Sequence, residues 1–322
     1  MKKQFSIYLI LLSIVLFSSC QDEELSTPAA SFTASSVVLK INESVEFKFD
    51  GMAQKMSIFP GDEEHLFDSI QSGNTGFVMN KGVFNYAYRY PGRYKVVVVA
   101  SNFNDNAEQL LQDTTSIYVN VVDSDATIKF VSCPKVFYDE IAAENINNDW
   151  LIRLPQKILF KAQNLTVSSK QRLSVKLGSD SAQLLVNDVK FSSTTSYELK
   201  NGIKLSVEPY SGEANIYNMY MLYYPEFKTF TINGVAGVLT RNEYNYNKMT
   251  MIVALPVGTD VTALIPEFTL SEGQNVTVSG VEQTSAVSAL DFTNTVNFEL
   301  TNTSTTIPAL SAKTVVSVTV TH

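Results

Sequence analysis

The chain has 322 residues, 45% of them hydrophobic and 17% charged, with 24 Lys and Arg against 32 Asp and Glu for a formal net charge of −8. This apolar content excludes a globally disordered chain, and at ~150 residues per domain the length predicts two or three domains. The acidic balance disfavours nucleic acid as a partner, because nucleic-acid binding needs a basic surface. Two histidines, His65 and His322, are too few for the usual zinc centres and His-dependent nucleophiles. We therefore expect no metal, no cofactor and no enzymatic activity.

The N-terminal segment predicts export. Lys2 and Lys3 precede an apolar run over residues 7–17 that is too short to span a ~30 Å hydrocarbon core comfortably. Residues 1–19 are therefore predicted to be a signal peptide. The segment LFSSC, which ends at Cys20, resembles a bacterial lipobox, although Phe17 stands where the usual pattern has Leu. This resemblance implies that Cys20 is lipidated and begins the mature chain; the alternative is an ordinary signal peptide with a coincidental cysteine.

The residues after Cys20 extend this prediction. Gln21-Asp22-Glu23-Glu24 resembles the acidic export signal of Bacteroidota lipoproteins, and the resemblance implies an outer-membrane protein that faces the cell exterior. A solvated acidic tether is the alternative reading. Residues 20–27 are predicted to be a lipidated tether, and loss of Lys2 and Lys3 changes the net charge from −8 to −10. Lipidation of Cys20 leaves Cys133 without an intramolecular disulfide partner.

Beyond the tether we predict an all-β chain. Apolar runs recur about every 8–12 residues between Gly, Pro, Asn and Asp turns, which is typical of β-sandwiches. The best short helical candidates are Phe67–Ile70 and Asp139–Asn145. We predict three tandem Ig-like β-sandwich modules at residues 28–124, 125–225 and 226–322, and for the middle module we identify no family motif.

The first module carries two motifs of interest. Tyr88-Arg89-Tyr90-Pro91-Gly92-Arg93-Tyr94-Lys95-Val96 predicts a tight turn into a strand whose Tyr94, Val96 and Val98 face the core. Phe59-Pro60-Gly61-Asp62 is a second, degenerate motif. Together they resemble a polycystic-kidney-disease (PKD) type Ig-like domain, although the second lacks the family's Trp and the Gly after Asp. The resemblance implies a spacer or adhesion module.

The third module carries the most specific motif of the chain. Residues 255–266 read LPVGTDVTALIP, and Asp291-Phe292-Thr293 precedes a predicted strand at Val296–Leu300. Pro256 is expected to end a strand, Gly258 to supply a positive φ and Asp260 to cap the loop. This pattern closely resembles an Ig-like domain near the C-termini of Bacteroidota surface lipoproteins, including those of polysaccharide-utilisation systems. The resemblance informs location and architecture more than activity.

Two polar segments could hold chemistry. Asp62, Glu63 and Glu64, with His65 and Asp68, could bind Ca²⁺ or act as acid and base, but neighbours on one loop usually diverge, so a solvated loop is favoured. Residues 102–106 alternate oxygen donors with Asp113 at the twelfth place, yet lack the Gly and Glu of a calcium loop. We interpret them as a polar hairpin loop, and whether either segment binds calcium stays open.

Aromatic residues with polar neighbours are the better candidates for sugar binding. Sugar rings pack on flat aromatic faces, and their hydroxyls pair with amide, carboxylate or guanidinium groups. Residues 241–247 form a predicted hairpin in which Tyr244 and Tyr246 would share one strand face, with Arg241 and Asn245 beside them. Trp150 follows Asn147, Asn148 and Asp149 and is the second candidate.

Two functions agree with these features. The first is a surface-exposed, lipid-anchored, non-catalytic glycan-binding protein, accessory to an outer-membrane polysaccharide uptake system with a TonB-dependent importer as partner. Tyr244, Tyr246, Arg241, Asn245 and Trp150 would bind the polysaccharide or oligosaccharide. The alternative is an adhesion or structural module of the cell envelope that binds a protein partner.

Overall fold

The computed structural model describes residues 25–104, 107–136, 139–160, 163–243, 245–304 and 310–322. Within these ranges the regular structure is β-strand except for the 3₁₀ helix η1 (Phe67–Ser72), so the predicted all-β class is confirmed. No helix in the same ranges is long and apolar enough to cross a membrane. Contacts divide the chain into unit 1, which ends at Asp123, and unit 2, which begins at Ser124. Residues 125–225 and 226–322 share unit 2, so their division stays a prediction.

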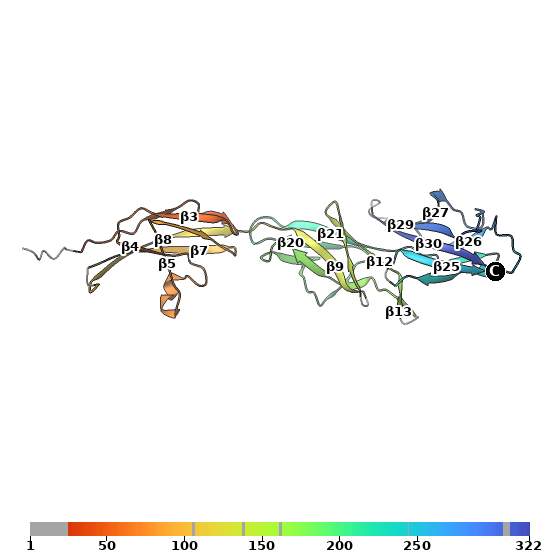
Figure 1. Cartoon of the computed structure of the whole chain (residues 1–322), viewed down its shortest axis with the longest axis horizontal. Coiled ribbons are helices and arrows are strands. Elements are labelled where there is room, and N and C mark those ends of the chain that lie inside the picture. The colour runs from red at the N-terminus through yellow and green to blue at the C-terminus, as the bar shows by residue number, and fades with distance from the viewer. Residues whose placement is uncertain (1–24, 105–106, 137–138, 161–162, 244, 305–309) are drawn as a thin grey trace, which may run out of the picture. The chain divides into compact units, whose positions relative to one another are not determined.

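Unit 1 is built from two sheets (Figure 1). Their strand orders are β1-β3-β6 and β2-β8-β7-β4-β5. The strands are β1 (Phe32–Ala34), β2 (Val38–Lys40), β3 (Ser44–Phe49), β4 (Lys55–Phe59), β5 (Phe77–Val78), β6 (Val83–Ala87), β7 (Gly92–Phe103) and β8 (Leu110–Val122). Phe47 of one sheet and Val98 of the other are fully buried in the same core cluster. Unit 1 is therefore a β-sandwich.

The turn-and-strand motif of unit 1 folds as predicted. Val96 and Val98 are fully buried in β7, and Tyr94 packs against the same core. Tyr88 is 1% exposed, and its hydroxyl donates to the Pro60 carbonyl at 2.9 Å. This contact ties the loop after β4 to the core. The PKD-type assignment itself stays a prediction.

The first part of unit 2 contains a six-stranded sheet, order β11-β12-β21-β20-β17-β18, and a three-stranded sheet, order β10-β9-β16. The same part also contains the two-stranded sheets β13-β14 and β15-β19. The strands are β9 (Ile128–Val136), β10 (Asp139–Ala142), β11 (Glu144–Ile146), β12 (Asp149–Leu154), β13 (Lys157–Phe160), β14 (Gln163–Thr166), β15 (Lys170–Arg172), β16 (Ser174–Leu177), β17 (Gln183–Val186), β18 (Val189–Lys190), β19 (Ser196–Glu198), β20 (Ile203–Glu208) and β21 (Asn215–Tyr223).

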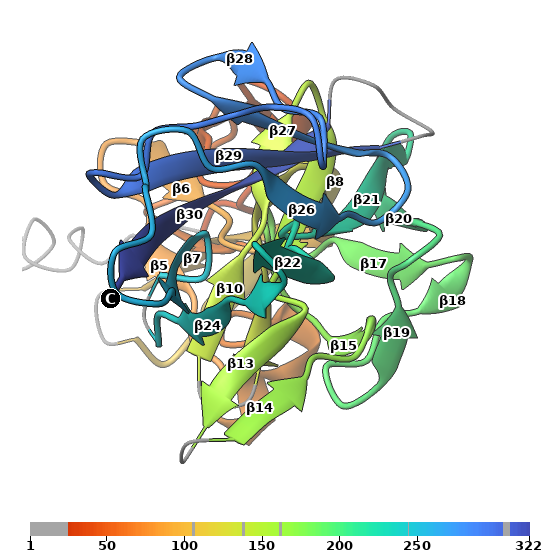
Figure 2. The ribbon, with the colours of Figure 1, turned by 90° about the vertical axis from the view of Figure 1, so that its right-hand side faces the viewer.

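The second part of unit 2 contains a three-stranded sheet, order β23-β22-β26, and a six-stranded sheet, order β24-β25-β30-β29-β27-β28. The strands are β22 (Thr229–Ile232), β23 (Val235–Ala236), β24 (Val238–Arg241), β25 (Lys248–Ala254), β26 (Pro266–Thr269), β27 (Gln274–Val278), β28 (Val281–Glu282), β29 (Val296–Thr303) and β30 (Ser311–Thr321). Figure 2 shows the antiparallel strands β29 and β30 side by side. Phe230 of the smaller sheet and Phe298 of the larger are buried in one core.

In unit 1 and in each part of unit 2, the last long strand pairs in parallel with an earlier strand of the same sheet. β8 pairs with β2, β21 with β12, and β30 with β25 in parallel, whereas the other strand pairs in the described residues are antiparallel. Parallel partners cannot be joined by a tight turn, so the chain between them crosses to the other sheet. This crossing joins the two sheets of each sandwich.

One secondary-structure prediction is wrong. Asp139–Asn145 was expected to be helical, but Asp139–Ala142 forms β10 and pairs antiparallel with β9, and Glu144 begins β11. The pairing with β9 and β12 overrides a weak local helical pattern. At Phe67–Ile70 the structure has η1, a 3₁₀ helix, so this second candidate is helical but short.

Four β-hairpins of unit 2 have tight two-residue turns between their strands. Each pair of turn residues has positive φ, which identifies type I′ turns. The turns are Asn147-Asn148, Asn187-Asp188, Asn233-Gly234 and Ser279-Gly280. The loop predicted at residues 256–262 also forms: Gly258 has φ +88°, and the Asp260 carboxylate accepts from the Thr262 amide at 2.9 Å. Apart from Ser279, the positive-φ positions of these turns hold Asn, Asp or Gly, which tolerate left-handed backbone.

Gly234 gives a direct test of this turn chemistry. A Cβ at Gly234 would meet no atom within 4 Å, yet its φ is +76°. Gly234→Ala is therefore expected to cost about 1–2 kcal/mol through backbone strain alone, and Gly234→Asn less. Urea unfolding of unit 2 can be followed by the fluorescence of Trp150, the only tryptophan. The midpoint urea concentration should be highest for the unsubstituted chain, lower for Gly234→Asn and lowest for Gly234→Ala. Equal midpoints for the two variants would contradict the assignment.

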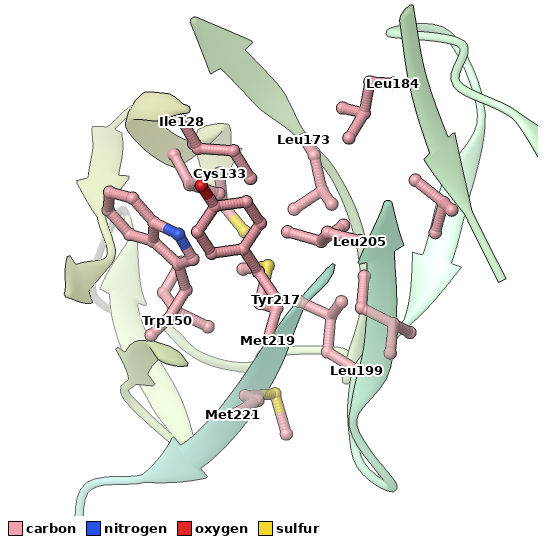
Figure 3. Close-up of a cluster of buried hydrophobic side chains, with 14 of the residues drawn as sticks. Ile128, Cys133, Trp150, Leu173, Leu184, Leu199, Leu205, Tyr217, Met219 and Met221 are labelled. Carbon is pink, nitrogen blue, oxygen red and sulfur yellow. The ribbon is translucent and has the colours of Figure 1, made fainter. Parts of the chain in front are cut away.

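The core of residues 126–221 also makes a prediction about Cys133 (Figure 3). Cys133 is fully buried, and burial raises the pKa of its thiol to about 12. Only the thiolate reacts with disulfide reagents. At pH 8 the native chain from residue 21 onward should leave Cys133 unmodified by a thiol reagent, and unfolding in guanidinium should release one equivalent. Rapid labelling of the native chain would contradict the burial of Cys133.

Candidate functional site

A polar depression lies on the sheet that contains β24, β25, β30 and β29. Its volume is about 460 Å³, within the range of small-ligand sites. We call it the hairpin depression, because the turn between β24 and β25 lies at its edge. Its lining residues are Thr240, Arg241, Asn242, Lys248, Met249, Thr250, Asn297, Val315 and Ser317. Seven of these nine residues carry a hydroxyl, amide or cationic group, and no aromatic ring is among the described lining residues.

Strand register aligns four of these polar side chains. Thr240 is opposite Thr250, Thr250 opposite Ser317, and Ser317 opposite Asn297. Directly opposite residues point to the same face, and strands lie ~4.8 Å apart, so the row extends for roughly 14 Å across the sheet. The Ser317 hydroxyl donates to the Asn297 side-chain oxygen at 2.7 Å. We call this set the hydroxyl row.

The turn beside the depression is held by local hydrogen bonds. The Asn242 side-chain oxygen accepts from the Asn245 amide at 3.0 Å, and the Asn245 carbonyl accepts from the Lys248 amide at 3.1 Å. The Val315 amide donates to the Asn247 carbonyl at 2.9 Å and thereby fixes the turn to β30. Asn245, a predicted ligand-binding residue, thus has its backbone committed to the turn, while its side chain is partly exposed.

Arg241 lies at a joint between the two parts of unit 2. Its guanidinium forms an ion pair with Glu226, with Nε donating at 3.2 Å, and Nη1 donates to the Asn164 side-chain oxygen at 2.9 Å. The two paired side chains are only 10% and 7% exposed. Because these bonds engage its donors, Arg241 can line the depression but is poorly placed to bind a ligand as predicted.

Tyr246 belongs to the same joint. It lies in the turn before β25, not within a strand, so the predicted alternation with Tyr244 on one strand face is wrong for Tyr246. Its hydroxyl donates to the Asp139 carboxylate. Burial raises the pKa of Tyr246, and the hydrogen bond and negative charge of Asp139 raise it further. Tyr244 itself lies outside the described residues.

The expectation that Trp150 stacks on sugar is corrected by the structure. Its side chain is 5% exposed, and Figure 3 shows the indole inside the core cluster with Cys133 and Tyr217. Trp150 lies on the inward face of β12, which has β11 and β21 on either side, and this placement buries the ring. The neighbouring Asn147 and Asn148 form a type I′ turn, so their amides serve backbone geometry.

In the acidic loop of unit 1, the side chains of Asp62, His65 and Asp68 each contact a different partner. Asp62 accepts from the Tyr86 hydroxyl, the His65 Nδ1 lies 2.7 Å from the Thr75 carbonyl, and Asp68 lies 3.6 Å from the Lys95 ammonium. Within the described ranges, no three His, Cys, Asp or Glu side chains are grouped to hold a metal ion. Cys20, the predicted lipidation site, lies outside the described residues.

Sequence reasoning missed the hydroxyl row. Thr250 and Ser317 are 67 positions apart and meet only through the parallel pairing of β25 with β30. The available signal was alternation: in residues 248–254 and 315–320, Thr and Ser occupy positions between buried Met and Val. That pattern marks an outward face but does not tell which strands lie together.

The buried ion pair predicts a large stability effect. Arg241→Met leaves the Glu226 carboxylate buried without its partner, which should cost about 3–5 kcal/mol, whereas the double variant with Glu226→Leu should recover most of it. Lys204→Met, which removes an exposed ion pair to Asp188, should cost at most about 1 kcal/mol. Urea unfolding followed by Trp150 fluorescence measures all three. A single variant as stable as the double would contradict this role for Arg241.

Comparisons with known proteins give one family and several structures. The family described as SGBP, N-terminal, matches residues 227–320, which include the whole hairpin depression. No curated protein matches the chain. A solved glycoside hydrolase, itself tentatively assigned, from Bacteroides thetaiotaomicron is 22% identical with a TM-score of 0.20, over 30% of this chain and 24% of that one.

Two further structures cover more of the chain. Carbohydrate-binding modules of the β-sandwich superfamily are 13% identical with a TM-score of 0.24, over 61% of this chain and 85% of theirs. The titin I-band fragment I67–I69 is 10% identical with a TM-score of 0.23, over 93% and 100%. At these low TM-scores the likenesses say nothing about ligands. Residues 227–320 are thus similar to the SGBP N-terminal family.

Proposed function

We propose that this chain is a surface-exposed, lipid-anchored glycan-binding protein, accessory to an outer-membrane polysaccharide uptake system. The observation that carries the proposal is that the segment similar to a surface glycan-binding protein family, residues 227–320, also contains the hairpin depression. The anchor at Cys20 and a TonB-dependent importer as partner belong to the same proposal. They are supported by the lipobox-like segment and the acidic residues after it.

The chemistry of the depression suits a sugar chain. The hydroxyl row offers both donors and acceptors at ~4.8 Å intervals, and sugar hydroxyls need such two-way partners. Lys248, exposed at the edge, adds three donors. Because the described lining residues include no aromatic ring, recognition would depend on hydrogen bonds, in contrast to the stacking expected from the sequence.

We propose binding without catalysis. A glycosidase places two carboxylates on either side of the scissile bond. The titratable side chains that line the hairpin depression, within the described part of the chain, are Arg241 and Lys248, both cationic. Neither replaces such a carboxylate pair.

Affinity electrophoresis on a broad polysaccharide panel tests the function. The chain from residue 21 onward should be retarded by at least one polysaccharide. For that polysaccharide, Thr250→Ala, Ser317→Ala and Asn297→Ala should each weaken retention about three- to tenfold, because each removes hydrogen bonds worth ~0.5–1.5 kcal/mol.

Matched control variants test whether the polysaccharide binds at the hairpin depression or elsewhere on the chain. Thr229→Ala and Thr269→Ala remove an exposed hydroxyl pair, 2.7 Å apart, on the other sheet of the same part of unit 2 and should leave retention unchanged. Gln183→Ala tests a second depression, of about 350 Å³, that is lined by Gln183 and Phe191. If only Gln183→Ala loses retention, the polysaccharide binds at this second depression. If no polysaccharide retards the chain, the adhesion alternative is favoured.

A further inference from the structure

A pair of exposed apolar side chains lies beside the hydroxyl row. Val238 of β24 and Ile252 of β25 are directly opposite each other and are 70% and 50% exposed. Each is two residues along its strand from a member of the hydroxyl row, Thr240 or Thr250, and therefore points to the same outward face. We call Val238 and Ile252 the apolar pair. It lies ~7 Å from the hydroxyl row along the strands.

The adjoining residues show that the apolar pair faces outward. Leu239 and Met251 are directly opposite each other and pack into the core of the second part of unit 2, so the members of the apolar pair, next to them in sequence, face away from that core. Across β30 the same row continues with Thr319, which is directly opposite Ile252. The Thr319 hydroxyl is 2.8 Å from that of Thr295. The apolar pair is thus bordered by hydroxyls along the strands and across the sheet.

Strand geometry alone does not account for apolar side chains at these two positions. Thr is β-branched like Val and Ile and is also favoured in strands, and it occupies outward positions 240, 250 and 319 of the same three strands. Val238 and Ile252 therefore place apolar surface on a face that carries hydroxyls at neighbouring positions. Apolar contact area beside a few placed polar groups is typical of a ligand site.

The two neighbouring rows match the two kinds of surface on a sugar ring. Ring hydroxyls need donors and acceptors, which the hydroxyl row offers, and the C–H groups of the ring gain from contact with apolar side chains. The hydroxyl row and the apolar pair contain no charged side chain. In the next outward row Lys248 and Glu299, of opposite charge, are each opposite Val315. A charged group held against the apolar pair would lose hydration without gaining a partner.

We propose that the apolar pair and the hydroxyl row form one site for an uncharged polysaccharide. The apolar pair covers the C–H face of a sugar, and the hydroxyl row binds hydroxyls of the same or the adjoining sugar. This inference rests on the proposed function and names its substrate class. A protein partner fits less well, because a stable protein interface covers about 800 Å² on each partner and would also bury Lys248 and Glu299.

Threonine substitutions test the apolar pair. Val238→Thr and Ile252→Thr keep a β-branched side chain but place a hydroxyl against the C–H face of the sugar. On a polysaccharide that retards the chain from residue 21 onward, each should weaken retention about three- to tenfold, because that hydroxyl is buried without a partner. Val281→Thr is the matched control: Val281 is 65% exposed on β28, at the other edge of the same sheet, and its substitution should leave retention unchanged.

The outcomes separate this inference from the proposed function. If both Thr variants of the apolar pair are retained as well as the unsubstituted chain or better, while Thr250→Ala is weakened, the apolar pair is not part of the site and glycan binding stands. If no polysaccharide retards the unsubstituted chain, the inference and the proposed function are both overturned. Urea unfolding followed by Trp150 fluorescence shows whether each variant is folded.

Salt dependence tests the substrate class. Titration calorimetry with the retarding polysaccharide should give the same dissociation constant at about 0.05 M and 0.5 M salt, because screening does not weaken contacts between uncharged groups. Lys157 and Lys248 line one small pocket beside the hydroxyl row and are the groups that an acidic polysaccharide would contact. Retention confined to acidic polysaccharides, with binding lost at high salt, would place the ligand at these lysines and overturn the uncharged class.

Discussion

The parallel pairing of β25 with β30 is the constraint on which the candidate site depends. Seven consecutive partners, from Lys248 opposite Val315 to Ala254 opposite Thr321, fix its register. On one face this register buries Met249, Met251 and Val253 against the core, and on the other it aligns Thr250 with Ser317. A slip of one residue would exchange the two faces, so the same burial that stabilises the sandwich also sets the hydroxyl row.

The joint within unit 2 shows why residue type alone misidentifies binding residues. Arg241 and Tyr246 have the chemistry of sugar contacts, and both are used to hold the turn before β25 against residues 139 and 164 of the preceding part. Arg153, in the first part of unit 2, reaches the second part: its Nε donates to the Ser311 carbonyl at 2.7 Å. Its guanidinium also forms an ion pair with Glu144. Polar residues that satisfy each other across a joint are not available to a ligand, and sequence does not tell the two uses apart.

The sequence predicted the all-β class, because alternation is a local signal that burial preserves. The strand whose Val96 and Val98 face the core and the loop with Gly258 and Asp260 are examples, since each depends on neighbours within a few residues. The failed predictions concern distant partners. Trp150 is buried because its side of β12, which lies between β11 and β21, faces the core, and Asp139 is in a strand because β9 is adjacent; local pattern reveals neither.

The four type I′ turns of unit 2 do not join strands of the hairpin depression, but they share one property with the hydroxyl row: the outward side chains are carried by strands. Two-residue turns leave no long loops at those hairpin ends, so the side chains that face solvent around them are mounted on paired strands. A strand-borne surface is already ordered before binding and loses little conformational freedom when a ligand arrives. Selectivity on such a surface comes from the spacing of its side chains, which the backbone fixes. The surface does not rearrange to bind a ligand whose polar groups do not match that spacing.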